Sequence, residues 1–509
     1  MTSAAGAPAK WAKLIDQTRC IGCHACSTAC KSENEVPLGV HRTYVKSVDV
    51  GVFPEARRAF QVTRCNQCAS APCVTACPTS AMYARPDGIV DFDKSVCIGC
   101  KACMAACPYD AIFINPDDHS AEKCNFCAHR LDVGLEPACV VVCPSEAILI
   151  GDLNDPSTRV ARAAFRDVVA VRRPEKETRP KLFYKGAHQA TLDPLAARRP
   201  AAGLFMWSEQ GTRPDGPSIA SGHPGGANSS AAALLSWDVP HAVPWDWKVS
   251  LYTFTKGIAS GAYLVAVALL LCGVLEPEGA LWRWGAPLLA GFFLALTGVL
   301  LISDLEHPAR FTMIFTRPHW SSWLVKGAVV ITGYSAVLAL HFLSSLLGWG
   351  RLRVALMVPG LPLAALAAVY TAYLFAQAKA RDLWQNPLLP LQLFAQAVLA
   401  GAASLLVVST FFAPEAVGIL SWITAGASVV HLLLVWSETT MTHATAHARL
   451  AAWEMTDGRY RVFFWSGVAL VAAGALSGWL GAPAAPFALA GLLAYEHAYV
   501  QAAQAVPLA

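Results

Sequence analysis

Sixteen of the seventeen cysteines in this 509-residue chain fall before residue 144, where they form four groups of four. The first and third groups follow the spacing C-x2-C-x2-C-x3-C, which is typical of bacterial [4Fe–4S] ligation. Three closely spaced thiolates can bind one cubane, and the fourth cysteine usually reaches a different cluster, so the sequence predicts four [4Fe–4S] clusters. In chain order the groups are Cys20, Cys23, Cys26 and Cys30; Cys65, Cys68, Cys73 and Cys77; Cys97, Cys100, Cys103 and Cys107; and Cys124, Cys127, Cys139 and Cys143.

Two other roles for these cysteines are weaker. Disulfides are typical of secreted proteins, and Met1 to Trp11 contains neither the apolar core of a secretory signal nor a twin-arginine pair. Structural zinc sites use paired C-x2-4-C hooks, without the repeated triplets found here. The seventeenth cysteine, Cys272, lies in an apolar run, and we expect it to be a small buried hydrophobic residue.

The elements that must position the cysteines differ in composition along the chain. Hydrophobic residues make up 55% and charged residues 15%, which favours a membrane protein, and a net charge of +4 does not indicate a nucleic-acid partner. Residues 11–187 contain the cysteines and no apolar run of spanning length, whereas 188–244 are rich in Gly, Pro, Ser and Ala and predict a linker. Residues 245–509 contain about eight apolar runs near the roughly 20 residues that a helix needs to cross a bilayer, so they predict an all-α polytopic membrane domain. The predicted spans are 249–274, 279–303, 322–347, 353–378, 387–411, 415–437, 463–480 and 482–503.

The cysteine half resembles the four-cluster iron–sulfur subunit of molybdoenzymes of the DMSO reductase superfamily, in its four groups and in RPKLFYKG near its end. The resemblance implies a ferredoxin-like α+β domain over 11–187 that transfers electrons and does not bind the substrate. It also implies that the outer groups pair with each other, as do the inner groups. The implied ligand sets are Cys20, Cys23, Cys26 and Cys143; Cys124, Cys127, Cys139 and Cys30; Cys65, Cys68, Cys73 and Cys107; and Cys97, Cys100, Cys103 and Cys77.

The membrane half resembles the anchor of DMSO and polysulfide reductases. The similarity lies in WDWKVSLYTFTKGIASGAYL at the first span and in SDLEHPARFTMIFTRPHWSSWLVKGA after the second span. In those families the cluster protein and the anchor are separate subunits, whereas here one chain contains both. The resemblance implies a quinone site beside the last cluster, a large molybdopterin-binding catalytic partner, and a multi-pass location in the cytoplasmic (inner) membrane.

Quinone chemistry exchanges two protons along with two electrons, so the site needs polar groups near the membrane surface. Such groups follow the second span and begin the first span, on the same side of the predicted membrane. The predicted quinone-site residues are Asp304, His307, Arg310, Lys256 and Tyr252. The alternative is an interfacial loop whose charges are solvated and whose tryptophans belong to the aromatic belt.

Three polar residues inside the predicted spans bear on other mechanisms. His431 and His497 share a depth on different helices, which is compatible with a haem, but the resembled anchors lack haem and none is expected. Glu496 is an intramembrane acid and therefore a candidate for a proton path. Few other charged groups lie within the spans, so proton translocation is not predicted.

The predicted function is electron transfer between a molybdopterin catalytic subunit and the quinone pool, ubiquinone or menaquinone. On the cluster side of the spans we count nine basic residues against three on the opposite side, which places the cluster domain in the cytoplasm. This asymmetry favours a sulfite dehydrogenase-like complex; a DMSO/polysulfide reductase-type or a formate dehydrogenase-type complex is the alternative. A redox-sensing transporter is a distant alternative, since the spans show no obvious inverted repeat.

Overall fold

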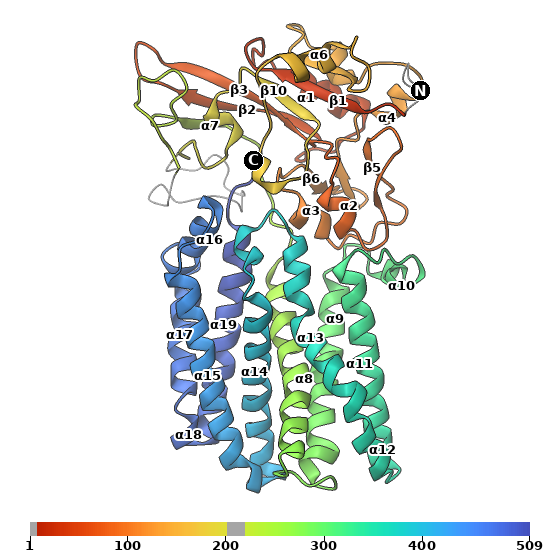
Figure 1. Cartoon of the computed structure of the whole chain (residues 1–509), viewed down its shortest axis with the longest axis vertical. Coiled ribbons are helices and arrows are strands. Elements are labelled where there is room, and N and C mark those ends of the chain that lie inside the picture. Colours follow the sequence, from red (N-terminus) through yellow and green to blue (C-terminus); the bar gives the residue numbers. More distant parts are fainter. Residues whose placement is uncertain (1–7, 201–218) are drawn as a thin grey trace.

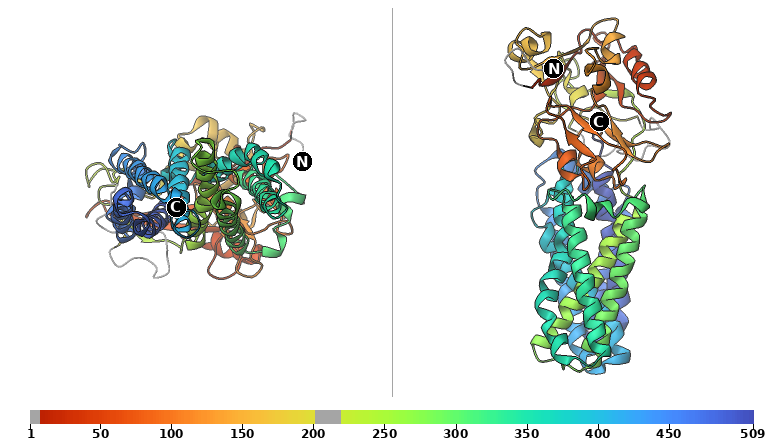
Figure 2. Two further views of the ribbon diagram at one scale, coloured as in Figure 1. Left: turned by 90° about the horizontal axis from the view of Figure 1, so that it is seen from below. Right: turned by 90° about the vertical axis from the view of Figure 1, so that its right-hand side faces the viewer.

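Two parts with different secondary structure follow one another along the chain (Figure 1). The computed structural model describes residues 8–200 and 219–509. Strands and short helices form the N-terminal part, and long helices extend from it as a rod (Figures 1 and 2). The predicted order of an α+β domain followed by a helical domain is therefore correct.

Two sheets frame the N-terminal part. The first has the order β8-β1-β10-β9, with β1 parallel to β10 and antiparallel to β8. The second has the order β11-β2-β3 and is antiparallel throughout. Val45 and Val62 face each other across β2 and β3, and they share a buried core with Ile15 of β1 and Leu182 of β10. The strands of the two sheets are β1 (Trp11–Asp16), β2 (Thr43–Val50), β3 (Arg57–Arg64), β8 (Ile148–Asp152), β9 (Val169–Ala170), β10 (Leu182–Lys185) and β11 (Leu234–Trp237).

Short helices carry part of each cysteine group. The hairpins β4–β5 and β6–β7 follow α2 and α3, so the two inner groups have the same local layout, and α2 packs on α3. These elements are α1 (Ala25–Glu33), α2 (Pro72–Ala76), β4 (Met82–Ala84), β5 (Val90–Phe92), α3 (Ala102–Ala106), β6 (Ile112–Ile114), β7 (Ala121–Lys123), α4 (Ala128–Leu131) and α5 (Ala138–Val141). Two further helices, α6 (Arg159–Arg166) and α7 (Gln189–Leu192), lie outside the cysteine groups.

The C-terminal part consists of eight main helices within the described residues, in two groups of four. In the first group, α8 and α11 each pack against α9 and α13; in the second, α14 and α17 each pack against α15 and α19. The main helices are α8 (Trp247–Leu271), α9 (Ala286–Ser303), α11 (Trp323–Leu346), α13 (Met357–Gln377), α14 (Leu389–Phe412), α15 (Val417–Thr440), α17 (Arg461–Gly474) and α19 (Ala485–Gln504). Shorter helices between them are α10 (Met313–Thr316), α12 (Gly350–Ala355), α16 (Ala446–Thr456) and α18 (Ser477–Leu480).

The two bundles touch through their first helices, α8 and α14, at a pair of glycines. A Cβ atom on Gly261 would lie 1.7 Å from the carbonyl oxygen of Ala397, and one on Gly401 would lie 2.0 Å from the carbonyl carbon of Gly261. Only residues without a side chain permit this approach, so the glycines fix how the bundles pack together.

Six helices within the described residues are long and apolar enough to cross a membrane. They correspond to the first six predicted spans. The seventh predicted span overlaps the shorter apolar helix Arg461–Gly474, and the eighth overlaps α19, which packs against α17. A count of eight spans therefore remains a prediction.

Two other predictions differ from the structure. The middle of the predicted 188–244 linker, 201–218, lies outside the described residues, but β11 pairs with β2 and so belongs to the N-terminal part. The composition of 188–244 did not predict this strand, because it is held by backbone hydrogen bonds to β2, and the residues around it are rich in Gly and Ser. Cys272 is exposed, because α8 ends at Leu271 and the chain turns there.

Candidate functional site

All seventeen cysteines are free thiols within the described part of the chain. The structure gathers the sixteen of the four groups in combinations that cross the groups. The thiol of Cys20 lies near those of Cys23 and Cys143, and the thiol of Cys30 lies near those of Cys124, Cys127 and Cys139. Likewise Cys107 lies near Cys65 and Cys68, and Cys103 lies near Cys97, Cys100 and Cys77. Thiols of different implied sets are also neighbours, since Cys103 lies near Cys73 and Cys26 lies near Cys139, so the division into four ligand sets stays a prediction.

The surroundings of the thiols fit iron–sulfur clusters. Burial raises the pKa of Cys100 and raises that of Cys107 to about 12, so a free thiolate is disfavoured at both positions and the positive charge of a bound cluster iron would stabilise it. Near the outer groups, buried cations assist as well: the Arg64 Nη1 donates to Cys139 Sγ at 3.0 Å, and the Lys13 Nζ lies 3.9 Å from Cys124 Sγ. Cys23 is exposed, whereas the cysteines of the two inner groups are buried.

The loop after α9 binds directly to the inner cysteine groups. The backbone nitrogen of His307 donates to the oxygen of Ile98 at 3.2 Å, and that of Glu306 donates to the oxygen of Gly99 at 3.4 Å. The Arg310 Nη1 donates to the oxygen of Cys97 at 2.9 Å. The helical part is thus attached to the loop that carries the third group, as Figure 1 shows where α3 and α2 meet the helix ends.

Gly99 makes this contact possible. Its φ of +69° is a left-handed conformation, and a Cβ atom there would lie 2.4 Å from Cβ of Glu306. No other residue type fits the space without displacing the loop.

A cavity of about 240 Å³ lies at this junction, between α8, α9, α11 and α13. Its wall includes Cys100 from the third group together with Tyr252 and Asp304. Most of the other lining residues are apolar, namely Val249, Leu301, Ile302, Leu305, Phe311, Ile314, Phe315, Leu324, Ala328, Ile331 and Leu374. The cavity can therefore hold an apolar ring beside a cluster ligand, with a hydroxyl and a carboxyl group within its wall.

Asp304 follows the last residue of α9 and is the acidic side chain in the wall of this cavity. Its side chain is 11% exposed, and burial raises its pKa to about 6, although the Lys101 ammonium at 3.6 Å opposes the shift. Lys101 also lies 3.0 Å from Glu306, whose other carboxylate oxygen is 3.6 Å from His119, a half-exposed side chain. A row of titratable side chains thus leads from the cavity to the surface.

The predicted quinone-site residues separate into two sets. Tyr252 and Asp304 line the cavity, and Lys256 lies one layer deeper, where its Nζ donates to the Thr371 Oγ1 at 2.6 Å. His307 and Arg310 bind the backbone of the third cysteine group and do not line the cavity. In place of an open cluster of five polar groups, the structure has two in the wall and three around it.

Sequence reasoning missed three residues at the junction. Tyr370 lines the cavity, and its ring centroid lies 4.8 Å from the Lys256 Nζ. Trp245 also lines it and donates from Nε1 to the oxygen of Cys100 at 3.2 Å. Lys101 follows Cys100 directly, so its position offered a signal; Tyr370 in an apolar span offered none.

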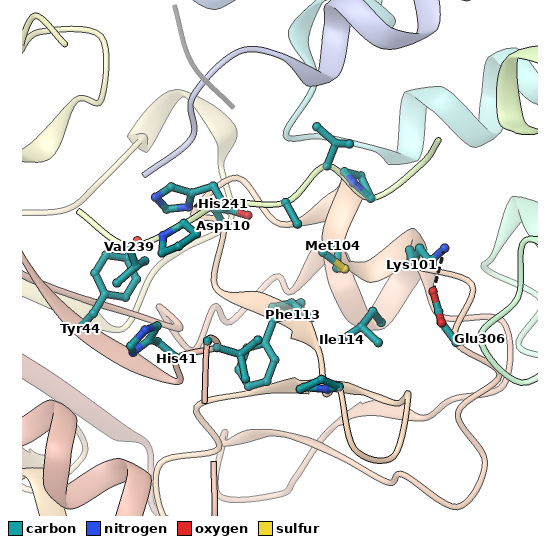
Figure 3. Close-up of a pocket in the computed structure, with 18 of the residues that line it drawn as sticks. His41, Tyr44, Lys101, Met104, Asp110, Phe113, Ile114, Val239, His241 and Glu306 are labelled. Carbon is teal, nitrogen blue, oxygen red and sulfur yellow. Dashed lines mark hydrogen bonds and ion pairs between the residues drawn. The ribbon is translucent and has the colours of Figure 1, made fainter. Parts of the chain in front are cut away.

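A second cavity, of about 600 Å³, lies on the flank of the junction (Figure 3). The Lys101–Glu306 ion pair borders one end, and His241 and Asp110 border the other (Figure 3). Burial opposes protonation of His241, but the Asp238 and Asp110 carboxylates raise its pKa to about 9. This buried ion pair attaches the segment before α8 to the loop after α3.

The two histidines considered for a haem each pack against aromatic rings. The ring centroid of His431 lies 4.8 Å from that of Tyr495, and the ring centroid of His497 lies 4.7 Å from that of Phe463. Glu496, which directly precedes His497, accepts a hydrogen bond from the Thr253 hydroxyl at 2.7 Å.

Comparison with known proteins agrees with this architecture. Residues 57–153 match the family described as 4Fe-4S dicluster domain, and residues 237–477 match the family described as Polysulphide reductase, NrfD. The chain is 43% identical over 204 residues to a subunit of the tetrathionate reductase of Salmonella typhimurium, covering 39% of this chain and 80% of the relative. It is 41% identical over 177 residues to a component of the polysulfide reductase of Wolinella succinogenes, covering 34% of this chain and 93% of the relative.

The chain thus belongs to this family of iron–sulfur reductase subunits, fused to an NrfD-type membrane domain. It is also 36% identical over 219 residues to the iron–sulfur subunit of an arsenate respiratory reductase of a Shewanella species, covering 34% of this chain and 94% of the relative. The resemblance predicted from the cysteine groups and the anchor motifs is confirmed. In this fusion protein the NrfD-type domain supplies the cavity, and the iron–sulfur domain supplies the cysteine in its wall.

Proposed function

We propose that this fusion protein transfers electrons between a molybdopterin-containing catalytic partner and a membrane quinone that reacts in the cavity of Tyr252 and Asp304. The observation that carries the proposal is the shared wall: Cys100 of the third cysteine group and Asp304 line one apolar cavity. An electron carrier and a proton acceptor therefore meet at the same ring.

The residues present fit four [4Fe–4S] clusters held by the sixteen cysteines in the four cross-group sets described above. Bound clusters supply one-electron steps, and the protein supplies positioning and proton handling. The apolar wall excludes water from a quinone ring, and the Tyr252 hydroxyl, which lies beside that of Thr371, can bond a ring oxygen. The Asp304 carboxylate accepts a proton from a hydroquinone hydroxyl, and Lys101 beside it stabilises the ionised form. Arg310 and His307 position the loop.

Replacing Asp304 tests this role. Asp304→Asn keeps the shape of the side chain and removes its proton acceptor, so quinone exchange should fall by roughly 10²-fold while iron content stays constant. The matched control is Asp246→Asn, because Asp246 is a half-exposed carboxylate at the start of α8. It caps this helix by accepting a hydrogen bond from the backbone nitrogen of Lys248, and asparagine caps equally well. Normal quinone turnover in Asp304→Asn would remove the cavity from the mechanism.

The opposite end of the proposed electron path is the outer pair of groups. Cys23 is the one exposed thiol among the sixteen described cluster-type cysteines, so the catalytic partner docks on this surface in our proposal. The proteins that this chain resembles are subunits of tetrathionate, polysulfide and arsenate reductases, which favours a reductase-type complex. A sulfite dehydrogenase-like complex rests on the asymmetry of basic residues alone. Sequencing the large subunit that co-purifies with this chain separates the two.

The same asymmetry supports a cytoplasmic cluster domain. Basic residues gather at the helix ends next to the iron–sulfur domain, as the positive-inside rule requires of a cytoplasmic face. Arg353, on the opposite face, is fully buried and paired with Glu278, which weakens the opposing charge further. Proteolysis of the domain in inverted but not in intact vesicles is the expected result; cleavage from the periplasmic side would reverse the assignment.

A further inference from the structure

The two bundles of the NrfD-type domain are arranged alike. Each forms a ring in which the first helix packs on the second and fourth, and the third helix packs on the same two. The first helices, α8 and α14, both begin at the end that faces the iron–sulfur domain, and the second helices, α9 and α15, both return to it (Figure 1). The bundles are therefore parallel repeats of one layout.

The cavity of Tyr252 and Asp304 has a counterpart in the second bundle. A cavity of about 620 Å³ lies where α14 begins and α15 ends, the same place in the ring. Gln392 of α14 occupies the role of Tyr252 on α8, and Glu438 near the end of α15 occupies the role of Asp304 after α9. Tyr495 on α19, the fourth helix of the second bundle, bonds to both of them; Tyr370, which lines the first cavity, lies on α13, the fourth helix of the first bundle.

Glu438 is built into a hydrogen-bonded site. It is 5% exposed, and its Oε2 accepts from the Gln392 Nε2 at 3.2 Å and from the Tyr495 hydroxyl at 3.1 Å. Its Oε1 accepts from the Asn386 Nδ2 at 3.2 Å. The Tyr499 hydroxyl also lies near this carboxylate, and Glu438 lines the cavity together with Asn386 and Gln392.

The rest of the cavity fits an uncharged ring with polar substituents. His443 lines it, and within the described residues its Nε2 has no hydrogen-bond partner. At the mouth, Leu388 and Met441 are exposed, which suits an apolar tail in the bilayer. Three acids, Glu175, Asp382 and Glu438, line the cavity against one lysine, so an anionic lipid headgroup is disfavoured.

We propose that this cavity is a second quinone-binding site, in which a hydroquinone hydroxyl donates to Glu438 and a ring oxygen faces His443. The inference rests on the proposed function, because the quinone chemistry of the first cavity identifies the ligand of its counterpart. The two sites differ in one respect: no cysteine lines the second cavity, and Glu175 and Lys176 take that place. The second site therefore binds a quinone without a cluster ligand in its wall.

Photolabelling tests the inference without relying on turnover. The full chain in nanodiscs is irradiated with a short-chain azidoquinone in its reduced, hydroquinone form, which carries the hydroxyl donor that the site requires, and labelled peptides are mapped by mass spectrometry. Two labelled regions are expected, one near residues 298–332 and one near 386–448. Glu438→Leu should reduce labelling of the second region by about tenfold, the scale of one lost hydrogen bond to a charged group. His443→Ala, which changes a half-buried side chain, should reduce it by a similar factor. Both should leave labelling of the first region and quinone turnover unchanged.

The reciprocal variant and the competitors complete the test. Asp304→Asn should reduce labelling of the first region alone. Labelling of the first region only would overturn the second site and leave the proposed function in place, whereas labelling of neither would overturn both. Labelling of the second region that persists in both Glu438→Leu and His443→Ala would show nonspecific partition of the probe and would overturn the second site. Labelling that is prevented by excess phospholipid and not by unlabelled quinone would show lipid binding and would overturn it as well.

Discussion

Gly99→Ala should disconnect the proposed quinone cavity from the third cysteine group without removing any proposed cluster ligand. The added Cβ would lie 2.4 Å from Cβ of Glu306 and 2.9 Å from its backbone nitrogen, whereas ordinary contacts begin near 3.4 Å. The loop must therefore move by about 1 Å, and the φ of +69° adds strain of about 1–2 kcal/mol. Misplacement of this size can reduce the rate of a positioned reaction by about 10²-fold.

The assay isolates the membrane end of the path. The purified protein is reduced with dithionite, which bypasses the catalytic partner, and reoxidation of the clusters by a short-chain quinone is followed by absorbance. Gly99→Ala should reoxidise about 10²-fold more slowly than wild type at equal iron content.

Gly22→Ala provides the matched control. Gly22 has the same C-I-G-C context and the same φ of +69°, and its added Cβ would meet the ring of Phe60 at 2.3 Å. The strain is comparable, but the contact lies in the first group, away from the junction, so reoxidation by quinone should be near normal. Equal rates in wild type and Gly99→Ala, with clusters intact in both, would refute the view that this backbone contact positions the cavity.

Three further outcomes are expected. Anaerobic protein should contain about 16 iron atoms per chain, four for each cubane; Cys100→Ser should lower the iron content or change its electron paramagnetic resonance, and Cys272→Ser, at an exposed helix end, should change neither. Folding raises the pKa of His241 from 6.5 to about 9, so its contribution to the free energy of unfolding, on the order of 3 kcal/mol, should be complete below pH 6.5 and lost as pH rises through 9. Thermal unfolding of His241→Gln should lack this pH dependence, and a profile identical to that of wild type would contradict the prediction. Gly261→Val should separate the bundles and lower the melting temperature in detergent, because its side chain would overlap Ala397, whereas Gly291→Ala, whose Cβ meets no atom within 4 Å, should not.

The parts of the site that the sequence predicts are those encoded locally. Cysteine spacing identifies the cluster-type groups because the ligands of one group lie within a few residues of each other. Asp304 could be predicted for a similar reason, since a carboxylate at the end of an apolar span needs a partner or a function. Its neighbour Tyr370 could not be, because a tyrosine within an apolar span looks like any other packing residue.

The contacts that join the two halves were not predictable, because they link residues far apart in the chain. Arg310 reads as a cation available to a quinone, but its guanidinium is occupied by the carbonyl of Cys97, 213 residues earlier. The strand β11 was hidden for the same reason: its partner β2 lies in another segment, and its own residues suggest a linker. Composition reports the propensity of a segment, and pairing depends on the edge that the rest of the fold presents.

If the proposed function holds, the arrangement at the junction separates the electrons and the protons of hydroquinone oxidation in space. Cys100 in the cavity wall belongs to the third cysteine group, so electrons from a quinone there would leave along the axis of the molecule toward the other groups (Figure 1). Asp304, Lys101 and Glu306 form a continuous row of ion pairs, 3.6 and 3.0 Å long, that ends beside the flanking cavity (Figure 3). Protons therefore have a polar route sideways to the solvent on the iron–sulfur side, while the apolar wall keeps water away from the ring. Because the same loop binds the third cysteine group and carries Asp304, a displacement of that loop disturbs both routes together.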